Sequence, residues 1–142
     1  MLNSELSYQL NFEGYWRHCN RGGLPTIAGV YVVYRCSYNQ ATDKVTLLEI
    51  IYIGQAENIN ERHKNHEKLS MFQGELKNGE ELCYSCAGVD GSSLELIENA
   101  LVFAQKPKLN DKLVDNYDFQ TAHIKLDGCT ACMKYTDFTI SR

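Results

Sequence analysis

The chain has 142 residues, a formal net charge of −4, 44% apolar residues and 23% charged residues. This length is typical of one domain with a single hydrophobic core, and the composition excludes a disordered chain, a collagen-like repeat and a coiled coil. The acidic balance argues against a protein whose whole surface binds nucleic acid, so any such site must rest on a local basic patch. We therefore expect a single domain over residues 1–142.

Residues 1–25 are expected to form an N-terminal arm with a short strand and a helical turn. The arm holds the only tryptophan, Trp16, and ends at a cluster of glycine and proline over 22–25,. Its first residues lack the basic and apolar stretches of a signal peptide, and no apolar run approaches the roughly 20 residues that cross a bilayer. We accordingly expect a cytoplasmic protein that does not enter a membrane.

Two strands are predicted over 29–36 and 46–54, where β-branched and aromatic residues dominate,. The polar segment between them is short, so they should form an antiparallel hairpin. A turn centred near residues 41–42 would place Tyr31 opposite Tyr52. These two tyrosines either pack against each other across the strands or bring two hydroxyls into a site.

A helix is predicted over 57–69, and its inward face is unusual. At 100° per residue, Arg62, His63 and His66 share one arc with only two aliphatic residues,. A buried amphipathic helix would place aliphatic side chains on most of that arc. The segment is therefore either a poorly buried surface helix or a helix whose polar side chains point into a site.

The rest of the chain predicts a third strand over 81–89 and a second helix over 92–106, which starts at a capping box and ends before a proline,. Residues 113–142 are expected to be a C-terminal extension. It would contain strands near 121–126 and 131–140.

One carboxylate of the second helix stands out. The helix is apolar almost all round, and Glu95, Asn99 and Lys106 form one narrow polar stripe. Glu98 lies outside that stripe, within an apolar arc, where a carboxylate is costly unless a cation, a metal or hydrogen bonds compensate it. The alternative is a glutamate that extends to the helix edge and reaches water. On the residues alone, Glu98 is the first candidate for chemistry.

Six cysteines are present, four of them in two CxxC pairs. Four such thiolates could hold structural zinc. However, Cys83 and Cys86 fall inside a predicted strand, where side chains three residues apart point to opposite faces. We therefore favour reduced, partly buried cysteines over structural zinc, and expect no disulfide in a cytoplasmic protein.

Several of these features occur in the order that is typical of one nuclease superfamily. The matching positions are Gly29-Val30-Tyr31, Tyr52-Ile53-Gly54, Arg62, His66, Glu98 and the motif Pro107-Lys108-Leu109-Asn110. The chain resembles the GIY-YIG nuclease superfamily on these residues, which span more than half of its length. The resemblance implies a compact α/β (α+β) domain with a small, mainly antiparallel three-stranded sheet flanked by helices. Its core would be residues 26–112, with 1–25 and 113–142 as additions.

The resemblance also implies a reaction, the metal-dependent hydrolysis of DNA phosphodiester bonds. Glu98 would hold one Mg²⁺ or Mn²⁺ ion, and no other cofactor is implied. Arg62 would bind phosphate oxygens, and Tyr31 would act as a general base or position the water, with His66 accepting or sharing its proton. The implied catalytic set is Tyr31, Tyr52, Arg62, His66 and Asn110.

The expected partner is DNA, including branched or structured DNA. Side chains near the catalytic set could supply the local basic patch and contact phosphates: Gln55, Arg62, His63, Lys64, Lys68 and Lys108. Gln55 stands where a number of members carry a lysine. Because one active centre cuts one strand, double-strand cleavage would need a dimer or two visits. A homodimer or a specificity partner is the other partner considered. The acidic charge keeps an alternative open, a weakly active or inactive module that binds nucleic acid or protein.

Overall fold

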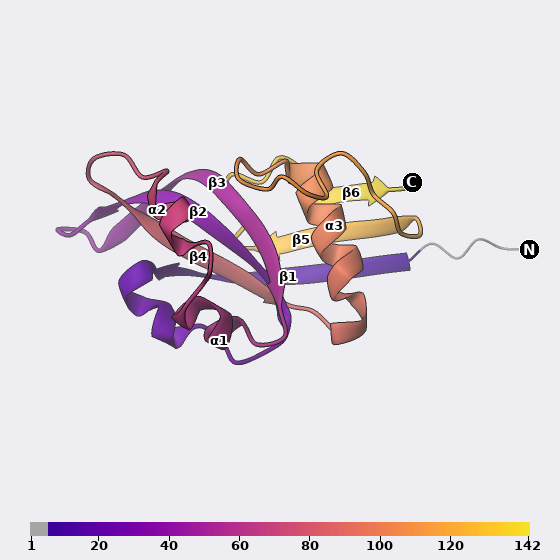
Figure 1. The fold of residues 1–142 in the computed structure, drawn as a ribbon, viewed down its shortest axis with the longest axis horizontal. Helices are drawn as coiled ribbons and strands as arrows, with labels where there is room; N and C mark the ends of the chain where they lie inside the picture. The colour runs from indigo at the N-terminus through magenta and orange to yellow at the C-terminus, as the bar shows by residue number, and fades with distance from the viewer. Residues whose placement is uncertain (1–5) are drawn as a thin grey trace, which may run out of the picture.

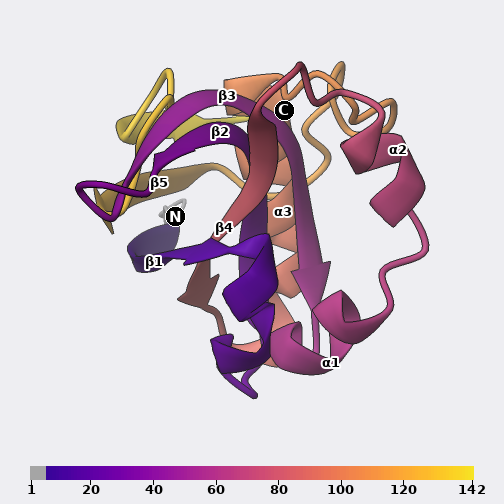
Figure 2. The same ribbon diagram turned by 90° about the vertical axis from the view of Figure 1, so that its left-hand side faces the viewer.

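The dominant feature of the fold is one six-stranded mixed sheet, seen in a computed structural model that describes residues 6–142. Across the sheet the strand order is β3-β2-β4-β1-β5-β6. The sheet curls into a half-barrel, and helix α3 lies across it (Figures 1 and 2). The strands are β1 (Leu6–Arg17), β2 (Gly29–Asn39), β3 (Lys44–Ala56), β4 (Glu80–Gly88), β5 (Ala122–Gly128) and β6 (Asp137–Ile140).

This sheet shows that the predicted fold class, a small three-stranded sheet flanked by helices, is wrong. Besides the antiparallel neighbours β3, β2 and β4, it includes β1, which pairs antiparallel with β4 and parallel with β5. β6 then pairs antiparallel with β5. The segments expected to be additions are thus part of the sheet, because Leu10 and Phe12 of β1 and Ile124 and Leu126 of β5 enter the same core as β2. Residues 1–5 of the predicted arm lie outside the described residues.

The predicted hairpin is confirmed, but its register differs from the one expected. β2 and β3 are antiparallel, and the pairing near the turn, Asn39 with Lys44, fits a turn centred at 41–42. Two irregularities further along the ladder each shift the register by one residue,. Tyr31 therefore pairs with Gly54, and Tyr52 pairs with Val33.

The helical segments are short. They are η1 (His18–Gly23), α1 (Ile59–Lys64), α2 (Leu69–Gln73), η2 (Gly91–Ser93) and α3 (Leu94–Gln105), where η denotes a 3₁₀ helix. The prediction of one helix over 57–69 is wrong, since α1 ends at Lys64 and α2 begins at Leu69. Asn58 caps α1, where its side chain accepts the backbone N–H of Glu61 at 3.1 Å.

The longest helix, α3, differs from its prediction at its N-terminus. Its predicted capping box does not form, because the Ser92 hydroxyl donates to the Asp90 carboxylate instead. Asn99, which shares the predicted polar stripe with Glu95 and Lys106, is buried and only 1% exposed. The Asn99 amide donates to the carbonyl oxygens of Leu113 and Asn116, so the loop after α3 covers it.

The two faces of the sheet carry separate hydrophobic clusters. Tyr34 belongs to the cluster under α3, whereas Tyr31 belongs to the cluster under α1 and α2. Cys83 and Cys86 of β4 are divided between the clusters in the same way, which confirms the argument that a strand turns them to opposite faces,. Within residues 6–142, the helices are too short or too polar to cross a bilayer.

Candidate functional site

Several predicted site residues gather at the free edge of β3. A cleft of about 460 Å³ opens there, between α3, the segment before α2 and the loop after α3. Tyr52, Glu98 and Asn110 line the cleft together with Lys68. Tyr52 lies on the face covered by α1 and α2, whereas Glu98 extends from α3 on the opposite face. The site therefore wraps around the edge of the sheet and draws on both layers of helices (Figure 1).

The Glu98 carboxylate is half-buried and held by one neighbour. The Gln55 amide donates to one of its oxygens at 3.0 Å. Burial raises the pKa of Glu98, while this hydrogen bond and the charge of Arg62 oppose the shift. A carboxylate has about four lone-pair sites, so the bond from Gln55 leaves room for a cation. Gln55 is thus placed beside the candidate ligand, on the strand that carries Tyr52.

Tyr31 is only 1% exposed and does not line the cleft, and its hydroxyl bonds to His66. The distance from its oxygen to His66 Nε2 is 2.7 Å. The other ring nitrogen of His66, Nδ1, accepts the backbone N–H of Lys68 at 3.1 Å and so carries no proton. Burial and the Arg62 charge lower the pKa of His66 to about 4, which keeps the ring neutral at pH 7. A neutral imidazole has one N–H, so Nε2 must carry it and donate to Tyr31.

The direction of that bond differs from the expected one, in which His66 accepts the phenol proton. As a donor, His66 orients the Tyr31 oxygen and would favour a phenolate as it forms. Burial is the largest influence on Tyr31 and raises its pKa, and the nearby Arg62 guanidinium opposes the rise. Tyr31 is therefore a phenol at neutral pH, with its own proton free to be donated elsewhere.

Gly54 permits this placement of Tyr31. A Cβ atom at position 54 would lie 2.4 Å from the Tyr31 hydroxyl oxygen and 2.5 Å from its ring carbon. The phenol thus rests directly on the backbone of β3. The other signature glycine has a different role, because a Cβ at Gly29 would lie 2.1 Å from the Ala87 carbonyl oxygen and 3.0 Å from Ile59. Gly29 allows the backbones of β2 and β4 to approach closely, and Gly54 leaves the space that the Tyr31 ring occupies.

Arg62 connects the members of the site electrostatically. Its guanidinium is partly exposed and pairs with the Glu67 carboxylate at 3.2 Å. Its positive charge lowers the pKa of each of four side chains that come from different elements: Tyr31, Tyr52, His66 and Glu98. Such a cation is suited to an incoming phosphate.

His63 is placed differently from the prediction that it contacts nucleic acid. Its side chain is 3% exposed, and its ring packs edge-on against Tyr31, with centroids 4.4 Å apart. On its other side lies Tyr84 of β4, at 4.7 Å. The Nε2 atom of His63 has no hydrogen-bond partner among the described residues, and burial lowers its pKa to about 3. A buried neutral ring cannot contact the phosphates of DNA. His63 instead packs against the Tyr31 ring and helps to fix its position.

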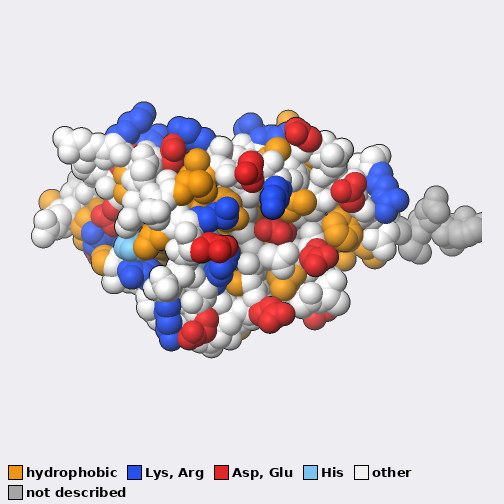
Figure 3. All heavy atoms as spheres, viewed as in Figure 1, with side chains coloured by type: hydrophobic (Ala, Val, Ile, Leu, Met, Phe, Trp, Pro, Cys, Tyr) orange, Lys and Arg blue, Asp and Glu red, His pale blue; other side chains and the backbone are white. Residues whose placement is uncertain are grey.

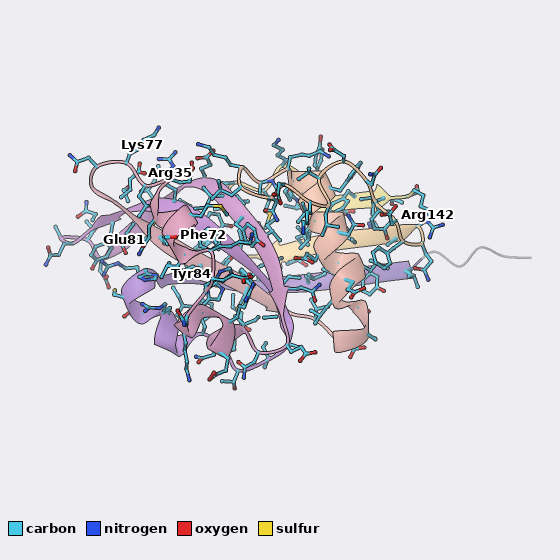
Figure 4. The ribbon with its side chains drawn as sticks, in the orientation of Figure 1. Arg35, Phe72, Lys77, Glu81, Tyr84 and Arg142 are labelled. Atoms are coloured by element: carbon cyan, nitrogen blue, oxygen red, sulfur yellow. The ribbon has the colours of Figure 1, made fainter. Side chains whose placement is uncertain are left out.

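An aromatic layer completes the floor of the site. Phe72 of α2 packs against the rings of both Tyr52, at 5.1 Å, and His66, at 4.9 Å. Figure 4 labels Phe72 and Tyr84, which both belong to the hydrophobic cluster under α1 and α2. The sequence did not single out either residue, although aromatic residues at these positions fit a buried helix face and a strand.

The predicted basic residues do not all reach the cleft. Lys68 lines it, with its ammonium 5.9 Å from the centre of the Tyr52 ring. Lys64 pairs with Glu61 at 2.7 Å, and Lys108 pairs with Glu75 at 2.7 Å. Lys112, which the sequence suggested as part of a basic face near Asn110, also lines the cleft. Acidic and basic side chains are intermixed on this face of the molecule (Figure 3).

The Asn110 side chain forms two hydrogen bonds with the backbone of β3. Its carbonyl oxygen accepts the N–H of Ile53 at 3.0 Å, and its amide donates to the Ile53 carbonyl at 2.9 Å. The preceding residue, Leu109, adds a bond to the carbonyl of Ile51 at 2.8 Å. Asn110 thus fixes the edge strand between Tyr52 and Gly54, so it positions the site and does not need to touch a substrate.

The donor set at Glu98 fits a weakly held Mg²⁺ or Mn²⁺ ion. No group of three or more His, Cys, Asp and Glu side chains is arranged for a metal within residues 6–142. A hard divalent ion that keeps several waters needs only one or two carboxylates, with substrate oxygens as further ligands. Glu98 would be that carboxylate, at the wall of a polar cleft.

Comparisons with known proteins add no further constraint. No family model, curated protein or solved structure matches the chain. The functional argument therefore rests on the residues and their geometry.

Proposed function

We propose that the chain is a divalent-metal-dependent endonuclease that hydrolyses DNA phosphodiester bonds at a single-metal site of the GIY-YIG type. One observation carries the proposal: Tyr31 is seated on Gly54 of the edge strand and bonded to His66, and Arg62 pairs with Glu67, which lines the same cleft as Glu98. A water-orienting hydroxyl, a phosphate-binding cation and a carboxylate for a metal are the groups that phosphodiester hydrolysis needs.

Each side chain has a distinct part in this proposal. Arg62 binds two non-bridging oxygens of the scissile phosphate through its planar fork. The Tyr31 oxygen orients the attacking water, and its phenolate form accepts a proton from it. His66 donates to the same oxygen and so stabilises the phenolate. A divalent ion on Glu98 would supply electrostatic stabilisation of the charge that develops on phosphate and leaving oxygens.

A second candidate is a module that binds nucleic acid or protein with little or no cleavage. The charges around the site favour it. Glu67 and Asp111 line the same cleft as Lys68 and Lys112, and the whole chain has a net charge of −4. Carboxylates beside a phosphate site weaken the binding of a polyanion.

The two candidates are separated by a cleavage assay on three substrates: supercoiled plasmid, a four-way branched duplex and single-stranded DNA. We expect cleavage with Mg²⁺ or Mn²⁺ and none with EDTA. Arg62→Ala should lower the rate by about 100-fold or more, as loss of a transition-state contact does. Glu67→Ala is the matched control, because it removes the same ion pair and keeps Arg62. Binding of DNA without cleavage of any substrate would favour the second candidate.

A further inference from the structure

A groove lies at the opposite edge of the sheet from the candidate site. It has a volume of about 410 Å³ and runs between β6 and the C-terminal end of α3. Figure 1 shows this end of α3 beside β6, the last strand of the sheet. Phe138 and Ile140 of β6 form one side of the groove, and Phe103 and Ala104 of α3 form the other. Glu98 and Phe103 are five residues apart and so point about 140° away from each other around the helix.

The outer edge of β6, beside the groove, is not paired with another strand of residues 6–142. Its other edge pairs with β5. An unpaired edge offers a row of backbone N–H and C=O groups to a further strand. A strand edge next to a helix, with an apolar floor between them, is the arrangement in which extended peptides add to a sheet.

The groove also carries a charge of one sign. Lys106 and Lys134 line it, and no acidic residue does. Lys134 is exposed and has no ion-pair partner among the described residues. Tyr135, next to it, is 56% exposed, the largest value among the exposed large hydrophobic residues described. In a chain of net negative charge, these lysines beside the exposed Tyr135 and the partly buried Phe103 and Phe138 favour an acidic, apolar partner,.

We propose that β6 and this groove bind an extended peptide segment in which apolar and acidic residues alternate. The peptide adds as a strand to the outer edge of β6. Its apolar side chains enter the groove between Phe138 and Phe103, and its carboxylates meet Lys134, while the Lys106 ammonium donates to the Val114 carbonyl oxygen. This proposal is independent of the candidate nuclease site, since none of its residues lines the cleft at Glu98.

The test measures fluorescence anisotropy of a labelled hexapeptide of alternating valine and glutamate, titrated with the full chain. We expect saturable binding that is at least about tenfold tighter than that of the valine–lysine hexapeptide, because the charge preference favours carboxylates. Lys134→Glu should reverse this preference. Lys125→Glu is the matched control, since Lys125 is exposed on β5 and lies outside the groove.

Two N-methylated versions of the peptide test the strand geometry. Methyl groups on alternate amides block one edge of a strand, so one version should lose binding and the other should keep it. Equal binding of both versions, equal binding of the lysine peptide, or no binding at millimolar peptide would overturn the proposal. A dimer of the chain, seen in sedimentation and not dissociated by the peptide, would assign the edge to a second copy and also overturn it.

Discussion

Gly54 determines where the Tyr31 hydroxyl lies, and this makes it a sharp test of the site. In Gly54→Ala the new Cβ would lie 2.4 Å from the hydroxyl oxygen, so the phenol must move. A displacement of about 1 Å costs on the order of 100-fold in rate, so cleavage should fall by about this factor. Rates and melting temperatures are compared with those of Gly22→Ala, whose Cβ meets nothing within 4 Å. Unchanged cleavage in Gly54→Ala would remove Tyr31 from the mechanism.

The pH dependence of cleavage reports on Tyr31. Its pKa is raised mainly by burial, so only a small fraction is phenolate at neutral pH. Well below the pKa this fraction increases tenfold per pH unit, so log(kcat/KM) should rise with a slope of about 1 from pH 6.5 to 9 without a plateau. The measurement is a rate profile of the wild type beside Tyr31→Phe, which should be flat and slow. A flat wild-type profile would mean that Tyr31 only positions the water.

At this scale the sequence indicated which residues meet, but not how they bond. The tyrosine–glycine triads and the buried carboxylate pointed to Tyr31, Gly54 and Glu98 through patterns along the chain. The proton on His66 could not be predicted, because it depends on a bond between Nδ1 and the backbone of Lys68. That bond exists only because the predicted helix breaks after α1.

The α1 segment links the site to stability at low pH. His63 in α1 and His66 in the segment after it are buried imidazoles with folded pKa values of about 3 and about 4, against about 6.5 in an unfolded chain,. Between pH 6.5 and the folded values, the unfolded chain binds protons that the folded chain does not. The free energy of unfolding should therefore fall with pH below 6.5, by up to about 1.4 kcal/mol per pH unit for each ring.

Urea unfolding at pH 7.0 and at pH 5.0 measures this effect. His63→Phe should keep more of its stability at pH 5.0 than the wild type, because one of the two titrating rings is removed. The same loss of stability in both proteins would show that His63 is not neutral in the folded state.

The loop after α3 acts on the edge strand through Asn110. Asn110→Ala removes both side-chain bonds to Ile53 and leaves two backbone groups of β3 without these partners. We expect a loss of about 1–3 kcal/mol in unfolding free energy and a fall in kcat, because Tyr52 and Gly54 flank the freed residue. Denaturant unfolding and steady-state kinetics check this, with Asp115→Ala as the control, since Asp115 is exposed in the same loop and lies outside the cleft. A wild-type kcat in Asn110→Ala would show that the bonds to Ile53 are not required to position the site.

Elements with strong local patterns were predicted well, and elements that depend on distant partners were not. The hairpin of β2 and β3 follows from β-branched residues and a short turn, whereas its two register shifts leave no mark in the pattern. β1 alternates only weakly, and its neighbours β4 and β5 lie far away in the sequence. The half-barrel therefore could not be derived from local preferences.

Over the whole molecule, the charge distribution limits how DNA can bind. Lys68 and Lys112 line the cleft, and Arg62 pairs with Glu67 of its wall, while Lys64 and Lys108 pair with carboxylates outside it. If two or three phosphates are neutralised, the slope of log K against log salt for duplex DNA should be about −2 to −3. Binding titrations between 50 and 200 mM salt measure it. A much steeper slope would require a basic surface away from this cleft.

The most direct test of the central claim compares two glutamates of α3. Glu98 lines the cleft and is half-buried, whereas Glu95, one turn earlier, is exposed and lies outside that cleft. The measurement is cleavage of supercoiled plasmid by Glu98→Gln and Glu95→Gln as Mg²⁺ and Mn²⁺ are titrated. We expect Glu98→Gln to lose metal-dependent cleavage while remaining folded, and Glu95→Gln to cut like the wild type. Cleavage by Glu98→Gln at the wild-type rate and metal dependence would contradict the assignment of Glu98 and the nuclease site built around it.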